Sequence, residues 1–242
     1  MKVMEVQTYE ELSQKASSIV ADIIRKKPDA VLGLATGGTP EGMYRELIRL
    51  HQTENLSFRN VTTVNLDEYA GLSSDDPNSY HYYMKSRFFQ HIDSKPSRHF
   101  IPNGQADNLE VECRRYEQIV EALGGTDIQL LGIGRNGHIG FNEPGTPFKS
   151  QTHVVTLNEQ TRQANARYFP SIDSVPKKAL TMGIQTILSS KRILLLISGK
   201  SKAEAAKKLL EGDINEDFPA SALHLHSDVT VLVDREAAAS RR

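Results

Sequence analysis

The segment LLGIGRNGHIGFNEP, residues 130–144, combines glycines with side chains that can exchange protons. Its apolar start is typical of a buried strand. Four glycines follow, and because each costs about 1 kcal/mol against alanine inside a helix, they predict a sharply folded loop. Asn136, His138 and Glu143 lie in this loop and can share a hydrogen-bonded proton. The sequence therefore predicts an acid–base site at the end of a strand.

The same segment contains the glycine spacing of a dinucleotide-binding turn. Gly132, Gly134 and Gly137 match the pattern GxGxxG, which requires a helix that begins at the third glycine and directs its free N–H groups at a pyrophosphate. Here Gly140 and Pro144 follow closely and make a poor helix. The sequence therefore disfavours a nicotinamide or flavin cofactor.

A second glycine turn, Thr36-Gly37-Gly38-Thr39, joins an apolar run to the start of a predicted helix. Glycines let the backbone approach a ligand, and the N–H groups and dipole of a helix N-terminus favour an anion. Because the turn lacks the GKS or GKT ending of a P-loop, a sugar phosphate fits better than a nucleoside triphosphate with magnesium. The alternative for this stretch alone is an ordinary tight turn.

Three charged residues elsewhere are candidates for the same site. Asp67 directly follows an apolar strand, where a partly desolvated carboxylate can act as a base, although an isolated Asp there can also be a cap. Lys202 opens the helix after the turn at Gly199 and can add positive charge to a phosphate. Arg167 is a further phosphate candidate, and its alternative is a solvated helix surface.

The histidines and the cysteine give no pattern that is typical of a metal centre. No compact His-x-x-His or HExxH spacing occurs, so we expect no metal at His138. His224 and His226 would share one face of a strand, with Leu225 between them, and a metal pair there is the less favoured interpretation. Cys113 is the single cysteine, which excludes an internal disulfide and a cysteine-based zinc site. It lies on the apolar stripe of a predicted helix and is expected to be buried.

The composition is that of an ordinary globular protein, with 38% hydrophobic and 24% charged residues. The net charge of −1 provides no field that would attract nucleic acid or an anionic membrane. No apolar run approaches the roughly 20 residues that span a bilayer. Residues 1–12 carry acids where a signal peptide has its apolar core. We therefore expect a cytoplasmic protein, and the uniform composition favours one domain, 1–242.

Runs of apolar residues alternate with stretches of helical periodicity along the chain. Strands are predicted at 30–35, 61–66, 128–133, 152–157, 193–197 and 229–233, and helices at 8–27, 41–51, 80–89, 107–123, 159–168, 176–188 and 200–210. This alternation predicts an α/β fold with an open, mostly parallel doubly wound sheet and helices on both faces, as in Rossmann-like proteins. Right-handed crossovers then place all strand C-terminal ends at one edge. The candidate residues would meet there in one crevice.

Several stretches together resemble the glucosamine-6-phosphate deaminases, within the glucosamine/galactosamine-6-phosphate isomerase family, over essentially the full length. They are LGLATGGTPEGMY (32–44), VTTVNLDEYAGL (61–72), PNSYHYYM (77–84), LLGIGRNGHIGFNEPG (130–145), TRQANARYF (161–169) and ISGKSKA (197–203). Any one of these alone is unspecific, whereas their joint occurrence in this order is highly specific.

The resemblance implies conversion of glucosamine 6-phosphate and water to fructose 6-phosphate and ammonia, without a metal or organic cofactor. The residue matching His138 would promote opening of the sugar ring, with partners at Asn136 and Glu143. The carboxylate matching Asp67 would move the C2 proton towards C1. Substrate contacts are implied for Thr36, Gly37, Gly38, Thr39, Gly137, Arg167 and Lys202.

One departure and two alternatives accompany this resemblance. Many family members carry Asp at the position of Asn136, and because Asn adds no negative charge, we expect Glu143 to provide most of the stabilisation of a charged His138. A 6-phosphogluconolactonase-like hydrolase shares the fold and the anion turn but needs no base at C2. A non-catalytic sugar-phosphate sensor would be expected to carry a DNA-binding domain, for which the sequence offers no segment. The oligomeric state is left open.

Overall fold

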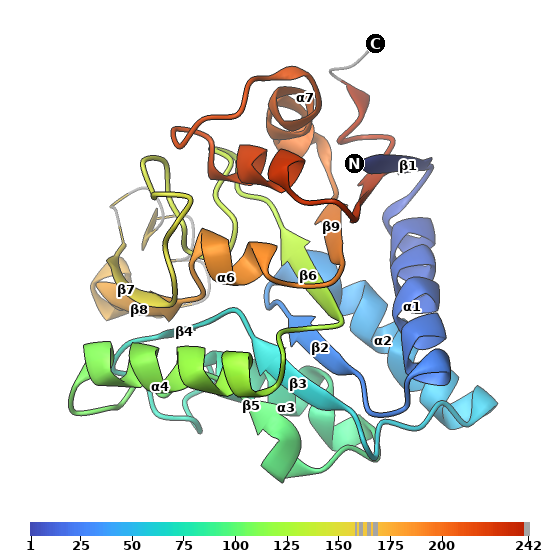
Figure 1. Ribbon diagram of the computed structural model, residues 1–242, viewed down its shortest axis with the longest axis horizontal. Coiled ribbons are helices and arrows are strands. Elements are labelled where there is room, and N and C mark those ends of the chain that lie inside the picture. Colours follow the sequence, from blue (N-terminus) through green and yellow to red (C-terminus); the bar gives the residue numbers. More distant parts are fainter. Residues whose placement is uncertain (158, 160–161, 164–165, 167–168, 240–242) are drawn as a thin grey trace.

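A seven-stranded sheet forms the centre of the computed structural model, which describes residues 1–157, 159, 162–163, 166 and 169–239 (Figure 1). All its neighbouring strands are parallel. The order is β1 (Lys2–Val6), β10 (Val229–Asp234), β9 (Ile193–Ile197), β6 (Ile128–Gly132), β2 (Val31–Leu34), β3 (Thr62–Asn65) and β5 (His99–Phe100). Every residue of β9, the most apolar run of the sequence, is buried, as expected for a central strand covered on both faces.

Helices cover both faces of this sheet, as the sequence predicts. Figure 1 shows helices on both sides, and those on one side connect strands in one direction while those on the other connect strands in the reverse direction. The first pair is α1 (Tyr9–Lys26) and α2 (Gly38–Glu54), and a short α3 (Tyr80–Arg87) follows β4. On the other side lie α4 (Leu109–Ala122), α6 (Ile184–Leu188) and α7 (Ala203–Glu211). The doubly wound α/β architecture is therefore confirmed.

The start of α1 shows how the sequence fixes a helix boundary. The Glu11 backbone N–H donates to Thr8 Oγ1 at 3.2 Å, and the Gln7 N–H donates to Glu11 Oε2 at 2.7 Å. These bonds satisfy N–H groups that have no partner inside the helix. Ser79 caps α3 and Asn108 caps α4 in the same way.

A second, three-stranded antiparallel sheet lies beside the first, at the left of Figure 1. Its order is β4 (Asp67–Tyr69), β8 (Lys178–Thr181) and β7 (His153–Thr156). The strand predicted at 152–157 exists but belongs to this sheet. The helix predicted at 176–188 is wrong in its first half, because residues 178–181 pair with both neighbouring strands and only Ile184–Leu188 is helical. Pairing and burial have overridden the local preference here.

The two histidines near the C-terminus also differ from expectation. His224 lies in a 3₁₀ helix, Pro219–Leu225, and His226 follows it, so they do not share the face of a strand. His224 Nε2 bonds to the Leu209 carbonyl at 2.6 Å, and His226 Nε2 bonds to the Ser190 carbonyl at 2.7 Å. Both side chains connect elements of the fold. Within the described part of the chain, no group of three His, Cys, Asp or Glu side chains is arranged to hold a metal ion.

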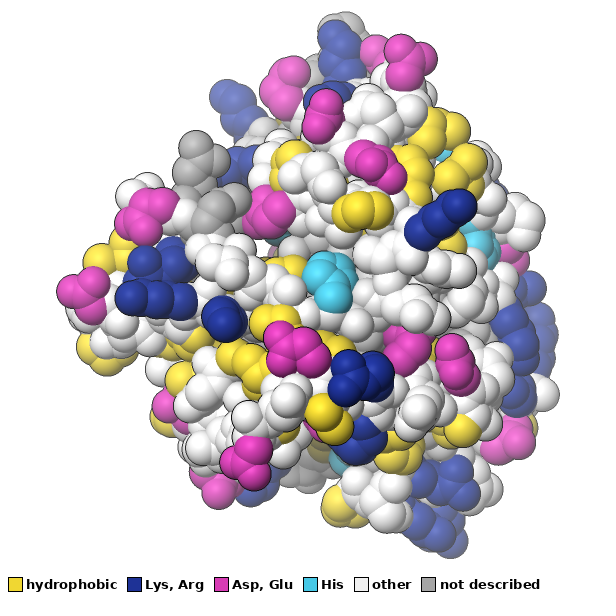
Figure 2. Space-filling model, turned by 60° about the vertical axis from the view of Figure 1, so that its left-hand side comes forward, with side chains coloured by type: hydrophobic (Ala, Val, Ile, Leu, Met, Phe, Trp, Pro, Cys, Tyr) yellow, Lys and Arg dark blue, Asp and Glu magenta, His cyan; other side chains and the backbone are white. Residues whose placement is uncertain are grey.

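The structure also tests the expectations about the cysteine, the surface charge and membrane-spanning helices. Cys113 is buried on α4, and burial raises the pKa of its thiol to about 12, so the thiol is unreactive. In Figure 2, basic and acidic side chains are interspersed over the visible face. No helix among the described residues is long and apolar enough to span a membrane. The helix predicted at 159–168 falls largely on residues outside the described ranges.

The close contact between α1 and α2 provides a test of the fold. A Cβ added at Gly42 would collide with Ser13 Oγ and lie 2.9 Å from the Tyr9 hydroxyl. We expect Gly42→Ala to lower the free energy of unfolding by about 1–3 kcal/mol, although alanine is the better helix former by about 1 kcal/mol. Urea unfolding would measure this. The control Gln52→Ala, at an exposed position of α2, should change stability by less than about 0.5 kcal/mol. A Gly42→Ala protein as stable as wild type would contradict the packing.

Candidate active site

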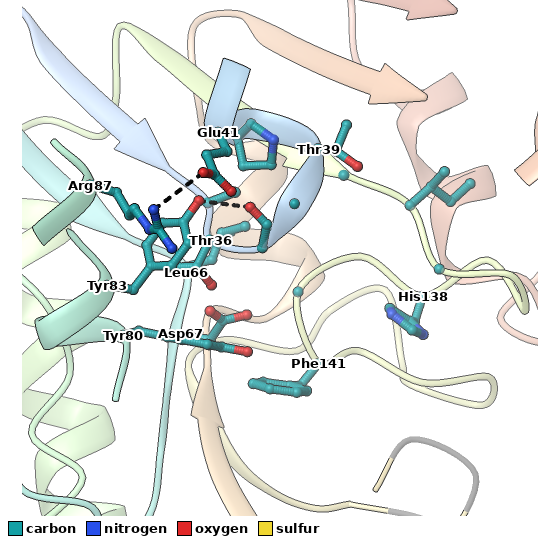
Figure 3. A pocket seen from close by; sticks show the side chains of 18 of the residues that line it. Thr36, Thr39, Glu41, Leu66, Asp67, Tyr80, Tyr83, Arg87, His138 and Phe141 are labelled. Carbon is teal, nitrogen blue, oxygen red and sulfur yellow. Dashed lines mark hydrogen bonds and ion pairs between the residues drawn. The ribbon is translucent and has the colours of Figure 1, made fainter. Parts of the chain in front are cut away.

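The C-terminal ends of four neighbouring strands open into one cavity of about 930 Å³ (Figure 3). Its lining includes most of the residues singled out in the sequence: Thr36, Gly37, Gly38, Thr39, Asp67, Asn136, His138 and Lys202. Glu143 and Gly137 belong to the same loop as His138 but are outside the lining. Arg167 lies outside the described residues. The parallel sheet thus brings together groups that are far apart in the sequence, as predicted.

The turn between β2 and α2 presents backbone N–H groups to this cavity. Gly37 precedes the helix with a φ of 100°, a conformation that favours glycine, and no side chain caps the first turn. Its N–H groups are therefore available to an anion. The Tyr83 hydroxyl donates to the Gly37 carbonyl at 2.7 Å. The Tyr9 hydroxyl accepts from the Gly42 N–H at 2.8 Å and lies 2.9 Å from the Gly38 carbonyl, to which it donates. Side chains from α1 and α3 thus hold the turn rigid.

A second turn, after β9, carries Lys202 to the cavity. Lys202 ends a 3₁₀ turn, Lys200–Lys202, that precedes α7. The buried Asp234 carboxylate at the end of β10 accepts from the Ser198 hydroxyl at 2.5 Å and from the Gly199 N–H at 3.0 Å. These hydrogen bonds to Asp234 fix the turn from which Lys202 extends. Two anion-attracting turns consequently border one cavity.

The loop after β6 contains a chain of hydrogen bonds that settles which nitrogen of His138 carries a proton. The Asn136 amide Nδ2 donates to Glu143 Oε2 at 2.7 Å, since a carboxylate can only accept. The Asn136 Oδ1 must then face His138 Nδ1, which lies 2.7 Å away and donates to it. Neutral His138 therefore keeps its Nε2 unprotonated, as a proton acceptor.

The surroundings of His138 favour this neutral form. Burial lowers the pKa of the imidazole below 6.5, and the charge of Lys202 lowers it further. Glu143, whose Oε1 is 3.8 Å from Nδ1, raises the pKa as expected from the sequence, but burial outweighs this effect. The ring is thus a base at neutral pH. The charged ring would still be stabilised by Glu143 once it takes up a proton.

A segment near the C-terminus holds this loop in place, which sequence reasoning did not foresee. Gly137 has a φ of 87°, and a side chain there would collide with the Phe218 ring. The Ala220 N–H donates to the Gly137 carbonyl at 2.8 Å. Glu216 accepts from two backbone N–H groups after the loop, those of Gly145 at 2.8 Å and Phe148 at 2.9 Å. Among the residues of this contact, Gly137 alone gives a signal in the sequence, because a glycine can mark a place where another segment packs closely.

Asp67 lies where β3 ends and the antiparallel sheet begins, with only 7% of its surface exposed. Figure 3 shows its carboxyl group in the same cavity as His138, with Phe141 between them in this view. Burial, and then the charge of Glu68, raise the pKa of Asp67 from 3.8 to about 8. A carboxyl group with such a pKa is a much stronger base than an ordinary aspartate once it has lost its proton.

The capping role considered for Asp67 belongs to its neighbour. Glu68 is almost fully buried, and its carboxylate accepts from the backbone N–H groups of Tyr80 and His81, both at 3.0 Å, at the start of α3. His81 Nδ1 contacts the same carboxylate at 2.8 Å. Glu68 thereby positions the helix that covers one side of the cavity, and Asp67 is left to face the cavity.

The pKa of Asp67 makes a prediction about stability. Between pH 4 and about 8 the folded protein holds a proton that the unfolded chain, with an Asp pKa of 3.8, has lost. Rising pH therefore reduces stability across this window and has no further effect through this group above it. Asp67→Asn has no carboxyl group to ionise at this position and so loses no stability in this way. Its free energy of unfolding relative to wild type should therefore increase from pH 4 to 8, by as much as roughly 5 kcal/mol.

Urea unfolding at several pH values would test this expectation. Asp75→Asn, in an exposed loop, is the control and should show a constant difference from wild type. A pH-independent difference for Asp67→Asn would show that the carboxyl group is not desolvated as the structure indicates.

Comparison with known proteins shows the family to which the chain belongs. Residues 4–232 match the profile of the family described as glucosamine-6-phosphate isomerases/6-phosphogluconolactonase. Glucosamine-6-phosphate deaminase 1 of Bacillus subtilis (strain 168) is 87% identical over 241 residues, covering 100% of both chains. A glucosamine-6-phosphate deaminase of Bacillus velezensis is 71% identical over 98% of this chain and 99% of its own.

Solved structures agree with these sequence relatives. The structure of a monomeric glucosamine-6-phosphate deaminase of the NagB superfamily has 87% sequence identity and a TM-score of 0.98 over 100% of both chains. A 6-phosphogluconolactonase from Trypanosoma brucei, 19% identical, has a TM-score of 0.75 over 100% of this chain and 98% of its own, and shows the shared fold alone. The chain therefore belongs to the family of glucosamine-6-phosphate isomerases and 6-phosphogluconolactonases.

Proposed function

We propose that this protein converts glucosamine 6-phosphate and water to fructose 6-phosphate and ammonia. One observation carries the proposal: two separate proton-handling groups, Asp67 and His138, face the same cavity as an anion-binding helix N-terminus and Lys202. The 87% and 71% identical relatives are named glucosamine-6-phosphate deaminases. An aldose–ketose isomerisation followed by loss of an amine requires this combination of a phosphate anchor and two bases.

The phosphate would be held by the backbone N–H groups of residues 36–39 and by Lys202. Arg167, predicted from the sequence, is proposed as a third contact. This end of the substrate takes no part in bond making, so its binding energy serves to orient the reacting end. The carbon atoms C1 and C2 then lie over the centre of the cavity, between the two bases.

Ring opening would be the task of His138. Its unprotonated Nε2 takes the proton of the anomeric O1 hydroxyl as the bond from C1 to the ring oxygen O5 breaks, and the proton is returned to O5. The product is an open-chain aldehyde. Asn136 keeps the imidazole in the required tautomer, and the carboxylate of Glu143 stabilises the charged ring between the two transfers.

Isomerisation and deamination would follow at Asp67. The ionised carboxylate removes the C2 proton while the ammonium group of the substrate gives a proton to O1, which yields a neutral enolamine, and Asp67 then delivers the C2 proton to C1. The resulting iminium carbon at C2 adds water, and ammonia leaves as the C2 ketone forms. The proposal assigns catalysis to Asp67, Asn136, His138 and Glu143, and all steps are proton transfers and additions that need no organic cofactor or metal.

A lactonase activity fits the cavity less well, although 6-phosphogluconolactonases share the fold. Hydrolysis of a lactone needs an activated water and no base at C2. A buried carboxyl group with a pKa of about 8, directed into the cavity, would have no role in that reaction. Assays of ammonia release from glucosamine 6-phosphate, without added metal, and of 6-phosphogluconolactone hydrolysis distinguish the two. Lactone hydrolysis without ammonia release would refute the proposal.

The setting of the reaction is part of the same proposal. We infer a single domain, 1–242, that acts in the cytoplasm on a small phosphorylated sugar and has no nucleic acid or membrane partner. The interspersed charges on the face shown in Figure 2 support the absence of a nucleic-acid partner. One relative with a solved structure is described as monomeric, which supports a monomer here.

Substitution of the proposed base would separate binding from catalysis. Asp67→Asn should stop exchange of the C2 proton with D₂O, measured by NMR, while inorganic phosphate still binds. In wild type, kcat/KM should rise with pH up to about 8, as Asp67 of the free enzyme loses its proton. Normal exchange in the variant would remove Asp67 from this role.

Substitution of His138 would test ring opening separately. His138→Gln should lower kcat/KM on the closed-ring substrate by about 10²–10⁴-fold. The loss should be much smaller on an open-chain 2-amino aldehyde phosphate that cannot cyclise, because that compound bypasses the step. Equal losses on both compounds would count against a ring-opening role.

A further inference from the structure

An acidic side chain stands at the phosphate end of the cavity, where a negative charge is unfavourable. Glu41 is in the first turn of α2, two residues after Thr39, and lines the same cavity. Its position favours the helix itself, since a carboxylate complements the positive end of the dipole. For an anionic substrate, however, the same charge is repulsive.

Two arginines compensate this charge. Arg87 Nη1, from the end of α3, is 3.5 Å from Glu41 Oε1, and Arg45 Nη1, one turn further along α2, is 3.6 Å from the same oxygen. Arg87 lines the main cavity, whereas Arg45 lines only a shallow recess beside it. In Figure 3, Arg87 points toward Glu41 on the Thr36 side of the cavity, and a dashed line joins them.

Stability is a poor explanation for this cluster. The arginine side chains are 58% and 64% exposed, and ion pairs at such positions contribute about 0–1 kcal/mol. The electrostatic effect of the cluster on an anion in the cavity is larger. Two unit charges about 8 Å apart near a protein surface interact by roughly 0.5–2 kcal/mol, which changes the binding of an anion severalfold.

We propose that Arg87 is a positioning residue for the substrate, which acts by cancelling the charge of Glu41 so that the phosphate meets the N-terminus of α2 and Lys202 without repulsion. This inference rests on the proposed function for the identity of the substrate. It does not require Arg87 to contact the phosphate. The cluster would therefore set the affinity for the phosphorylated substrate and leave the chemistry at Asp67 and His138 unchanged.

A double-mutant cycle tests this directly, with KM and kcat for glucosamine 6-phosphate measured at about 10 mM ionic strength. Arg87→Met should raise KM about 2–5-fold, because it removes the one positive charge of the cluster that also lines the main cavity and leaves only Arg45 beside Glu41. Glu41→Gln should leave KM unchanged or lower it, by up to about 3-fold. The double variant should have a KM close to wild type, and kcat should stay within about 2-fold throughout.

Three controls separate charge from structure. Arg87→Lys keeps the charge and should restore a KM near wild type. Glu46→Gln removes another paired carboxylate of α2, one bound to Arg49 at 2.9 Å and outside the cavity lining, and should not change KM. At about 500 mM salt the effect of Arg87→Met should shrink towards 1-fold, because the Debye length falls to a few ångströms.

Binding of inorganic phosphate, measured by calorimetry, reports on the inference without catalysis. It should weaken in Arg87→Met and recover in the double variant. A double variant as weak as Arg87→Met would show a direct contact in place of neutralisation and would overturn the inference, as would unchanged affinity in both variants. Absence of ammonia release by wild type would refute the proposed function, while the phosphate measurements would still decide the role of Arg87.

Discussion

The chain keeps a carboxyl group out of water at the junction of its two sheets, and much of the structure is arranged around that constraint. Asp67 begins β4, pairs with Thr181 of β8, and follows Leu66, whose carbonyl accepts from the Met182 N–H at 2.7 Å. The small antiparallel sheet thereby covers one side of the site. Tyr69 and Phe141, with rings 5.5 Å apart, add an apolar wall. Desolvation by these elements raises the pKa of Asp67, which suits it to the proposed removal of a proton from carbon.

The anion end of the cavity is constructed differently, from backbone held by distant side chains. Its glycine turns have little rigidity of their own, and hydroxyl or carboxylate groups from other elements fix them. Tyr9 and Tyr83 hold the first turn, and Asp234 holds the second. Such bracing lets N–H groups point at a ligand without reorganising when it binds, which is the condition for effective electrostatic stabilisation.

Sequence reasoning recovered the elements that burial dictates and missed those that depend on partners. Apolar runs identified β2, β6, β9 and β10, because a parallel strand covered on both faces must be apolar, and β-branched residues identified β3. The edge strand Lys2–Val6 was missed because only Val6 is buried, and β8 was assigned to a helix because its strand character comes from pairing. The sequence also predicted that the candidate residues meet in one cavity, because the C-terminal ends of parallel strands lie at the same edge of a sheet.

The finer properties of the site could not be read in this way. The neutral state of His138 depends on its burial, and the bracing by Phe218 and Tyr9 depends on contacts between segments far apart in the chain. The sequence also gave no sign that Arg87 would reach the cavity. The tautomer of His138 and the charge balance around Glu41 depend on side chains that are close in space and distant in the sequence. Local residue patterns contain no information about such neighbours.

The amide between His138 and Glu143 has a consequence for proton traffic. An amide nitrogen does not pick up protons near neutral pH, so Asn136 connects the two groups mechanically while insulating them from each other. A proton captured by the imidazole cannot drain to the carboxylate along this chain of bonds. In the proposed ring opening, the proton can therefore return to the sugar only through Nε2, the same nitrogen that captured it, and the carboxylate of Glu143 takes no part in the transfer.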